Sequence, residues 1–341
     1  MRSLRTALMV TAVVSLPLGL GLRAAGVPAV APPPPAHAQT GGSADRIIGT
    51  YRLVSTEVKD ASGKWSQTPS FNSIGYITYS DAGYMAVHIM PKDRPRFAGA
   101  QPTPEEAQNA IRGYAAYYGP FTVHEKDGLV IHTRVGKLNP GGPVDYRRYY
   151  EFVGNRLILI PADDGRPKDQ ETRRLIWERL PNVTLSPEAK KFVGFRRLLY
   201  TDRQTEKGGQ FVSHGEKNEA RAGSYIIYTP TGHMMAHLMD KEGRKPYAGT
   251  TPTPDEALAA YRGYGGYFGR FMVHNTENPQ YVIHQREGMP NPAPPTDVTR
   301  FYVFTGHVLR LAPPPTQTAT GEMSSSLLYW EPLPARSWKT K

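Results

Sequence analysis

The sequence predicts an all-β protein of two tandem antiparallel β-barrels, each with one short helix covering the barrel. Three observations support this fold class. Strand-like segments flank short turns, a long block of sequence occurs twice, and the 341 residues include 20 Tyr, 33 Gly and 32 Pro, a composition that favours strands and turns. The chain is long enough for two domains. It has no Cys, so its stability has to come from apolar cores rather than disulfides.

Each half of the chain consists of a series of hairpins. In the first half, the turn-forming residues 80–83, 126–128 and 154–155 separate segments rich in aromatic and β-branched residues. No segment has βαβ spacing, so we expect an antiparallel sheet. Each half has enough strands to close a barrel of about eight, and closure removes exposed sheet edges.

The repeat is clearest where residues 97–124 are set beside residues 247–274. Sixteen of these 28 positions are identical at a constant offset of 150. The correspondence continues in both directions, and both copies end in Trp-Glu, at Trp177 and Trp330. An internal repeat of about 140 residues indicates two copies of one folding unit.

One helix is expected in each copy. Residues 103–106 read TPEE and residues 253–256 read TPDE, which gives a Thr N-cap, Pro at the first helical position and Glu closing a capping box. Ala107, Ile111, Tyr114 and Tyr118 then follow at helical spacing, interrupted by Gly113. We expect these residues to form one apolar helix face that covers a barrel mouth.

The first 38 residues have the features of a secretory signal peptide. Arg2 and Arg5 precede an apolar stretch, and the sequence AHA at 36–38 matches a cleavage site. Pro and Gly interrupt the apolar stretch, so we expect no transmembrane segment to remain after cleavage. We predict a periplasmic or secreted protein. An uncleaved anchor is the alternative.

The other boundaries follow from the repeat and from a Pro-containing linker near residues 181–187. We predict one barrel domain over residues 46–181 and a second one over residues 188–334. Residues 39–45 and 335–341 are expected to be disordered. The linker is short, which allows the two barrels to pair within one molecule.

The basic charge of the chain does not indicate nucleic-acid binding. The 41 basic residues exceed the 30 acidic ones, but they are scattered and no nucleic-acid-binding motif is present. We interpret the excess as a solvated basic surface, and we expect no nucleic-acid partner.

Several motifs resemble those of the bacterial and fungal lipocalin-like domain family. In the first copy they are GTYRL at 49–53, GYITY at 75–79, GYM at 83–85, His132, Asn139-Pro140, Arg148 and LIWER at 175–179. The second copy keeps His284, Asn291-Pro292 and Arg300, but it departs from the opening motif at 194–196 and lacks the final Arg. The match covers nearly all of the chain after residue 38.

The resemblance implies a calycin-type barrel with a small-molecule cavity, and it supports binding by the second copy less well. Some relatives in natural-product pathways are thought to act as cyclases or isomerases. Fold alone does not fix function.

Three pairs of His recur between the copies: His88 and His237, His124 and His274, His132 and His284. His124 and His132 are eight residues apart across a hairpin, and their equivalents are ten apart. Because both differences are even, we predict that the two His of each hairpin face the same side of the sheet.

Two interpretations of that side remain open. Phe121, Val123 and Ile131 have the opposite parity, and apolar residues normally face the core, which would turn the His outward. Alternatively, His132 and His284 face inward, as the resemblance favours. Arg148 and Arg300 would then be donors for a carboxylate or enolate. A structural role for Arg148, stacked on Trp177 or closing the barrel base, is the other interpretation of that residue.

Tyr114 and Tyr264 follow an Arg-Gly pair and are expected at the cavity mouth, with plain helix packing as the alternative. Our candidate ligand-binding residues are His88, Tyr114, His132, Arg148, His237, Tyr264, His284 and Arg300. No metal-ligand spacing such as HxH or HExxH occurs, so we expect no metal site and no cofactor.

Three functions compete. The favoured one is binding of a small apolar or aromatic molecule in a barrel cavity, without turnover. The second is an isomerase- or cyclase-type enzyme, with His132 as general acid/base and Arg148 stabilising an oxyanion. The third is a non-catalytic interaction scaffold, which predicts no deep cavity. No Ser nucleophile elbow, phosphate loop or dinucleotide motif is present.

Overall fold

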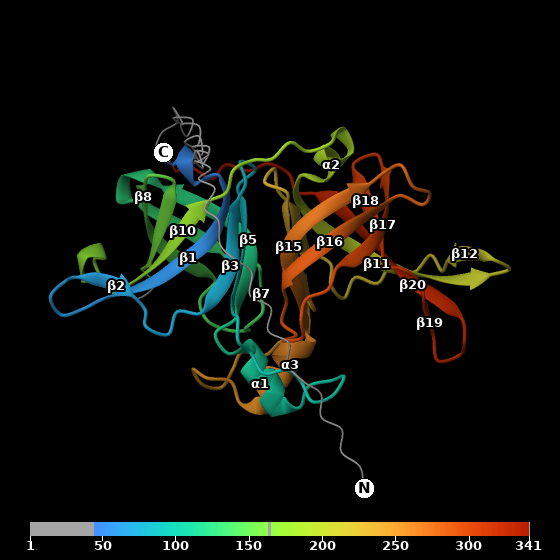
Figure 1. Ribbon diagram of the computed structural model, residues 1–341, viewed down its shortest axis with the longest axis horizontal. Coiled ribbons are helices and arrows are strands. Elements are labelled where there is room, and N and C mark those ends of the chain that lie inside the picture. Colours follow the sequence, from blue (N-terminus) through green and yellow to red (C-terminus); the bar gives the residue numbers. More distant parts are fainter. Residues whose placement is uncertain (1–43, 163–164, 341) are drawn as a thin grey trace, which may run out of the picture. The chain divides into compact units, whose positions relative to one another are not determined.

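The computed structural model describes residues 44–162 and 165–340 (Figure 1). The predicted signal peptide, residues 1–38, lies outside the described residues. The described chain forms two closed eight-stranded antiparallel barrels, which confirms the predicted fold class.

Barrel 1 closes where its first and last strands pair, as Leu53 meets Trp177. Its closed sheet runs in the order β10-β9-β8-β6-β5-β4-β3-β1. Its strands are β1 (Gly49–Lys59), β2 (Trp65–Gln67), β3 (Ser73–Tyr79), β4 (Tyr84–Pro91), β5 (Ala115–His124), β6 (Leu129–Thr133), β7 (Gly136–Lys137), β8 (Asp145–Val153), β9 (Arg156–Pro161) and β10 (Arg173–Arg179). Its helices are η1 (Asp45–Ile47), α1 (Pro104–Ile111), η2 (Glu125–Asp127) and η3 (Lys168–Gln170).

Barrel 2 repeats this order and closes between β11 and β20, where Leu198 meets Trp330. Its strands are β11 (Gly194–Lys207), β12 (Gln210–Ser213), β13 (Tyr225–Tyr228), β14 (His233–Met239), β15 (Tyr264–His274), β16 (Tyr281–Gly288), β17 (Val298–Thr305), β18 (Val308–Ala312), β19 (Thr316–Gln317) and β20 (Met323–Pro332). Its helices are α2 (Pro187–Phe192) and α3 (Pro254–Arg262).

The predicted hairpins and capping boxes are confirmed. Gly83 and Gly232 adopt φ of 88° and 76° in the turns that join β3 to β4 and β13 to β14, a conformation that Gly adopts without steric cost. The hydroxyls of Thr103 and Thr253 accept from the amides of Glu106 and Glu256, and each Glu side chain accepts from the Thr amide in return.

The helix prediction was wrong about its C-terminal end. α1 stops at Ile111, Gly113 has φ of 71°, and Tyr114 and Tyr118 lie beyond the helix, with Tyr118 inside β5. Because the chain reverses at Gly113, the helical spacing of the two Tyr does not form a helix face. α1 and α3 lie side by side and pack against each other rather than each covering its own barrel (Figure 1).

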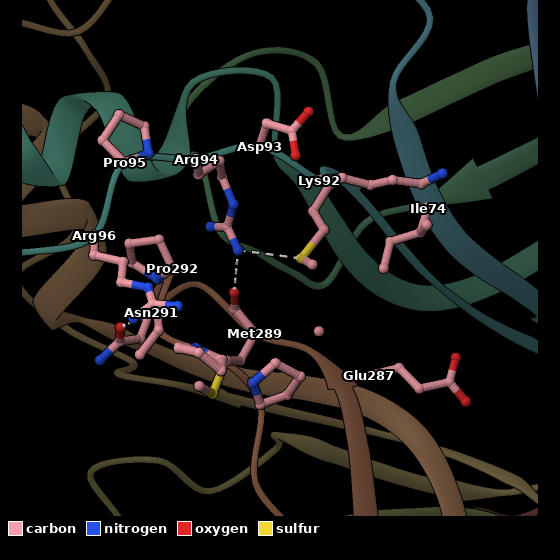
Figure 2. A pocket seen from close by; sticks show the side chains of 15 residues that line it. Ile74, Lys92, Asp93, Arg94, Pro95, Arg96, Glu287, Met289, Asn291 and Pro292 are labelled. Carbon is pink, nitrogen blue, oxygen red and sulfur yellow. Dashed lines mark hydrogen bonds between the residues drawn. The ribbon is translucent and has the colours of Figure 1, made fainter. Parts of the chain in front are cut away.

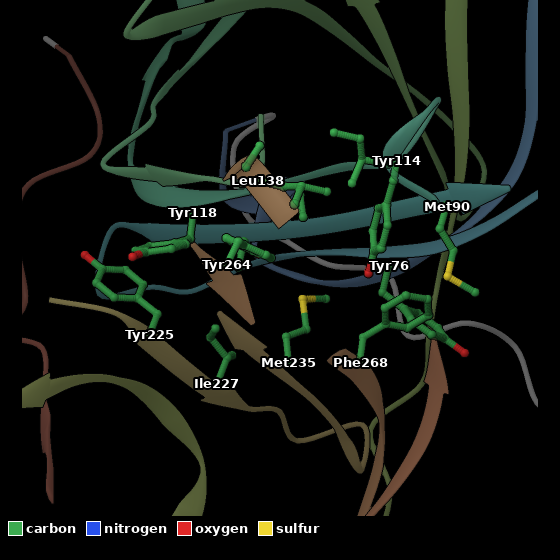
Figure 3. Packing of buried hydrophobic residues seen from close by; sticks show 14 of the residues in the cluster. Tyr76, Met90, Tyr114, Tyr118, Leu138, Tyr225, Ile227, Met235, Tyr264 and Phe268 are labelled. Atoms are coloured by element: carbon green, nitrogen blue, oxygen red, sulfur yellow. The ribbon is translucent and has the colours of Figure 1, made fainter. Parts of the chain in front are cut away.

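Three large apolar cores and one small cluster of Ile158, Ile160 and Ile176 hold the described chain together. One fills barrel 1 around Trp177, and one fills barrel 2 around Trp330. The third joins the outer faces of the two barrels and combines residues from both copies, including Tyr118 and Tyr225 (Figure 3). Strands β3 and β4 therefore have apolar side chains on both faces: one faces the lumen and the other faces barrel 2.

The C-terminal segment returns to barrel 1. Trp338 is 9% exposed and packs on Phe121, and its indole N–H donates to the carbonyl of Asp81 at 2.9 Å. Val123 N–H donates to the carbonyl of Trp338, and Thr340 N–H donates to that of Val123. The expectation that residues 335–341 form a disordered tail is therefore wrong for the described part, 335–340.

The fold begins slightly earlier than expected at its N-terminal end. Ala44 is buried, and Asp45 begins η1, so both belong to the fold although residues 39–45 were expected to be disordered. Over the described ranges, no helix combines the length and the apolar character needed to span a membrane.

Candidate functional site

A chain of three side chains, Tyr–His–Tyr, lies inside each barrel. In barrel 1, His132 of β6 bonds Tyr79 of β3 through Nε2 at 2.8 Å and Tyr117 of β5 through Nδ1 at 3.0 Å. In barrel 2, His284 bonds Tyr228 through Nε2 and Tyr267 through Nδ1, both at 2.8 Å. Both imidazoles are fully buried, so His132 and His284 face inward, as the second interpretation held.

Burial keeps these His uncharged. Desolvation lowers the pKa of His284 to about 3, and the positive charges of Arg300 and Arg286 act in the same direction. Burial also lowers the pKa of His132 well below its usual value, helped by Arg148. The pKa values of Tyr79 and Tyr228 are raised well above the usual value, first by burial. At neutral pH the Tyr–His–Tyr set of each barrel is therefore uncharged and connected by hydrogen bonds.

The hydrogen-bonding partners determine which atoms carry the protons in the Tyr–His–Tyr set of barrel 2. Neutral imidazole has one N–H and one acceptor nitrogen. Tyr228 is fully buried, and His284 is its one hydrogen-bond partner among the described residues. A buried hydroxyl proton without an acceptor costs about 1–3 kcal/mol, so Tyr228 donates to Nε2. Nδ1 of His284 then carries the proton and donates to Tyr267, whose own O–H is left to donate elsewhere.

Arg148 and Arg300 lie on the inner faces of their barrels, as the buried His do. Arg148 pairs with Val130 and Arg300 with Val282 across the sheet, and cross-strand partners point to the same side. The guanidinium of Arg148 lies 4.7 Å from the ring centroid of Tyr146, so its aromatic partner is Tyr146 and not Trp177. Val298 takes the place of Tyr146 opposite His284.

Barrel 2 contains a cavity of about 380 Å³ beside this chain. Its walls combine apolar side chains with Tyr267 and Arg300, and Thr201, Asn218, Arg221 and Ser326 also line it. The apolar lining consists of Ala220, Ile226, Ala236, Leu238, Leu311, Pro313, Leu328 and Trp330. Tyr267 thus joins the buried His284 to the open space of the lumen.

Two smaller side chains distinguish this lumen from that of barrel 1. At the offset of 149 residues that relates residues 75–90 to residues 224–239, Val87 aligns with Ala236 and Phe71 aligns with Ala220. Val87 and Phe71 both pack into the barrel 1 core, whereas both Ala line the barrel 2 cavity. The second copy, which the motif resemblance supported less well, therefore has the more open lumen at these positions.

Four predicted site residues lie between the barrels instead of inside them. His88 and His237 stack on each other in the shared core, with Tyr114 bonded to Nδ1 of His88 at 3.0 Å and Tyr264 bonded to Nδ1 of His237 at 2.6 Å. All four are buried. They are placed to join the barrels rather than to contact a ligand in either lumen.

The prediction that paired His share one side of the sheet was wrong. His124 pairs with Leu129, while His132 pairs with Phe121. Four residues separate His124 from Leu129, so cross-strand partners in this hairpin differ by odd numbers, and two residues an even distance apart face opposite sides. His274, which pairs with Tyr281, differs from His284 in the same way. Phe121 and Val123 therefore face the lumen together with His132.

Sequence reasoning missed Arg94 and Arg244, which clamp the two barrels together. Arg94 donates to the carbonyls of Met289 and Pro290, both at 2.7 Å, beside a hollow of about 590 Å³ lined by both barrels (Figure 2). Arg244 donates to the carbonyls of Lys137 and Leu138 in return. The two Arg recur between the copies, 150 residues apart, and recurrence is the signal that also marked the His pairs.

The Tyr partners of the buried His were missed as well. Tyr79 and Tyr228 recur between the copies, as do Tyr117 and Tyr267, but so do many core residues. Within the described residues, no group of three or more His, Asp or Glu is placed to hold a metal ion.

The comparison with protein families agrees with this architecture. The model of the lipocalin-like domain matches residues 48–180 and 214–332. No curated protein matches the chain.

Among solved structures, a protein of unknown function from Nostoc punctiforme is similar at 8% identity, with 84% of this chain and 97% of that chain covered and a TM-score of 0.20. A variant of transferrin binding protein B from Haemophilus parasuis is similar at 9% identity, with 80% of this chain and 64% of that chain covered and a TM-score of 0.22.

Proposed function

Because the chain belongs to the lipocalin-like domain family, we propose that it binds a small apolar or aromatic molecule, and that the ligand lies in the lumen of barrel 2. The cavity of about 380 Å³ carries this proposal. Small-molecule sites are typically concave, mostly apolar and about 300–1,000 Å³ in volume, with a few polar groups that orient the ligand. The apolar walls around Trp330, with Tyr267 and Arg300 as polar groups, fit that description.

Barrel 2 is favoured over barrel 1 by the side chains that differ between the lumens. Phe71 and Val87 add bulk to barrel 1 where Ala220 and Ala236 leave space in barrel 2. Transferring the barrel 1 side chains to barrel 2 is therefore a direct test, because the aligned positions of the other copy carry them.

The experiment titrates the neutral dye N-phenylnaphthylamine into the protein and follows its fluorescence. We expect one site in the unmodified protein and at least about tenfold weaker binding in the double variant Ala220→Phe/Ala236→Val. Val87→Ile, which adds one methylene to the lumen of barrel 1, is the matched control and should leave binding unchanged. Circular dichroism verifies that each variant is folded. Undiminished binding in the double variant would place the ligand outside this cavity.

The isomerase or cyclase alternative rests on one observation. Tyr267 lines the cavity and hydrogen-bonds the buried His284, so it could exchange a proton with a substrate while Arg300 stabilises an oxyanion. His132 is a poorer candidate than expected, because both of its ring nitrogens bond Tyr hydroxyls. Native mass spectrometry of protein from its source identifies a co-purifying molecule. NMR of that molecule, incubated with fresh protein, then separates turnover from binding alone.

The scaffold alternative predicts no deep cavity, and the barrel 2 lumen speaks against it. We also propose export to the periplasm or the medium, supported by the signal-like features of residues 1–38. Mass spectrometry of the purified protein should give a mature chain that begins at Gln39. A mass that retains residues 1–38 would contradict export with cleavage at this site.

A further inference from the structure

The charged groups in the barrel 2 cavity are all cationic. Arg221 and Arg300 line it, and its lining includes no Asp or Glu. Arg221 pairs with Asp240 at 2.6 Å. Arg300 forms no ion pair with any residue in the described ranges, and its Nη1 donates to the carbonyl of Thr299. The lumen therefore offers a guanidinium whose charge no carboxylate of the described protein neutralises.

Tyr267 presents a donor in the same cavity. Tyr228 donates to His284, and His284 donates to Tyr267, so the remaining proton of the chain is the hydroxyl proton of Tyr267. Inside a barrel this proton needs an acceptor, because an unmade buried hydrogen bond is costly. Arg300 and Tyr267 are thus two donors in one cavity that otherwise has many apolar side chains.

We propose that the ligand of barrel 2 is a small apolar or aromatic anion, whose single anionic oxygen group accepts hydrogen bonds from Arg300 and Tyr267. This inference rests on the proposed function of barrel 2 and adds the charge of the ligand. Arg forms short charge-assisted bonds to such groups, and the apolar walls around Trp330 hold the hydrocarbon part. His284 and Tyr228 are positioning residues, because they act through Tyr267 and lie behind it.

The test compares two dyes that share one ring system. N-phenylnaphthylamine is neutral, and anilinonaphthalene sulfonate carries one anionic group. Both are titrated into the full-length mature protein, into Arg300→Gln, Arg300→Lys, Tyr267→Phe and Tyr228→Phe, and into Arg262→Gln. The last variant removes one positive charge from an exposed position at the end of α3 and is the matched control.

We expect the unmodified protein to bind the anionic dye at least about tenfold more tightly than the neutral one, which corresponds to about 1.4 kcal/mol. Arg300→Gln should abolish this preference, because binding of the anionic dye weakens far more than binding of the neutral dye, whereas Arg300→Lys should restore part of the preference. Tyr267→Phe and Tyr228→Phe should each reduce the preference about threefold, and Arg262→Gln should leave it intact.

Two results would overturn the inference, and they differ from each other. If the neutral dye binds and the anionic dye gains nothing from Arg300, the ligand is not an anion, although barrel 2 still binds a small molecule. If neither dye binds, the proposed function itself fails and the anion inference fails with it. The same follows if Ala220→Phe/Ala236→Val binds both dyes as tightly as the unmodified protein does.

Discussion

The imidazole of His88 stacks on the imidazole of His237 between the two barrels, with ring centroids 4.1 Å apart and an interplanar angle of 22°. Burial lowers the pKa of His88 to about 3, although the carbonyl of Ala236 acts in the opposite sense. Burial also lowers the pKa of His237 well below its usual value, and the neighbouring His88 adds to the effect. Two imidazolium ions could not share this apolar contact, and burial keeps both rings neutral at neutral pH.

The first prediction concerns pH. An unfolded His titrates near 6.5, while His88 and His237 remain neutral in the folded protein down to much lower pH. Below about pH 6.5 the unfolded chain therefore binds protons that the folded chain does not, and the free energy of unfolding falls as the pH falls towards 3. Each of these imidazoles contributes up to about 1.4 kcal/mol per pH unit.

Urea unfolding at several pH values between 7.5 and 5 measures this slope. The carboxyl groups with lowered pKa, such as Glu106 and Asp202, act at lower pH, so this range isolates the His. The double variant His88→Phe/His237→Phe should have a shallower slope than the unmodified protein, whatever its absolute stability. Equal slopes would show that these two His do not change protonation on unfolding.

The second prediction concerns the clamp between the barrels. Arg94→Met removes the charged donor from the carbonyls of Ala110, Met289 and Pro290. We expect the free energy of unfolding to fall by about 2–4 kcal/mol, because buried carbonyls lose charge-assisted hydrogen bonds. Arg112→Met changes an exposed Arg and should alter stability by less than about 0.5 kcal/mol. Similar losses for both variants in urea unfolding would contradict the clamp.

The third prediction concerns the C-terminal segment. Trp338→Ala should destabilise barrel 1 by about 3 kcal/mol, since a buried Trp leaves a large void when truncated. The effect should be local: hydrogen exchange at Val123, whose amide donates to the carbonyl of Trp338, should become faster than exchange in barrel 2. Ser337→Ala, at an exposed position, is the control. Exchange that is unchanged in both variants would mean that the segment does not protect barrel 1.

The fourth prediction concerns a second ligand site. Phe71→Ala/Val87→Ala gives barrel 1 the side chains that barrel 2 has at the cavity. We expect the stoichiometry of N-phenylnaphthylamine to rise from one to two, at a cost of about 3 kcal/mol in the free energy of unfolding. Isothermal titration calorimetry measures the stoichiometry. A value that remains at one in a folded variant would show that other side chains close the lumen of barrel 1.

The fold was predictable because its signals are local. The turn at Gly83, its equivalent at Gly232 and the two Thr capping boxes each depend on a few neighbouring residues, and the repeat doubled every observation. Tyr114 was assigned to a helix because the spacing rule does not include the reversal of the chain at Gly113.

The candidate site was only partly predictable. His132 and His284 recurred in the motif resemblance, and both lie inside their barrels. The role of His88 depends on which outer faces of two barrels meet, and this is a long-range property that no single strand records. The His124 prediction failed because facing in a hairpin depends on the number of residues in the turn as well as on the spacing.

The contact between the barrels relates equivalent residues: His88 meets His237, and the clamps of Arg94 and Arg244 exchange roles. In a homodimer, one sequence would have to furnish both halves of such a contact, and any change in one lumen would occur in the other. Joining the two copies in one polypeptide removes that obligation. Barrel 1 can retain Phe71 while barrel 2 carries Ala220, so the two lumens can differ within one molecule.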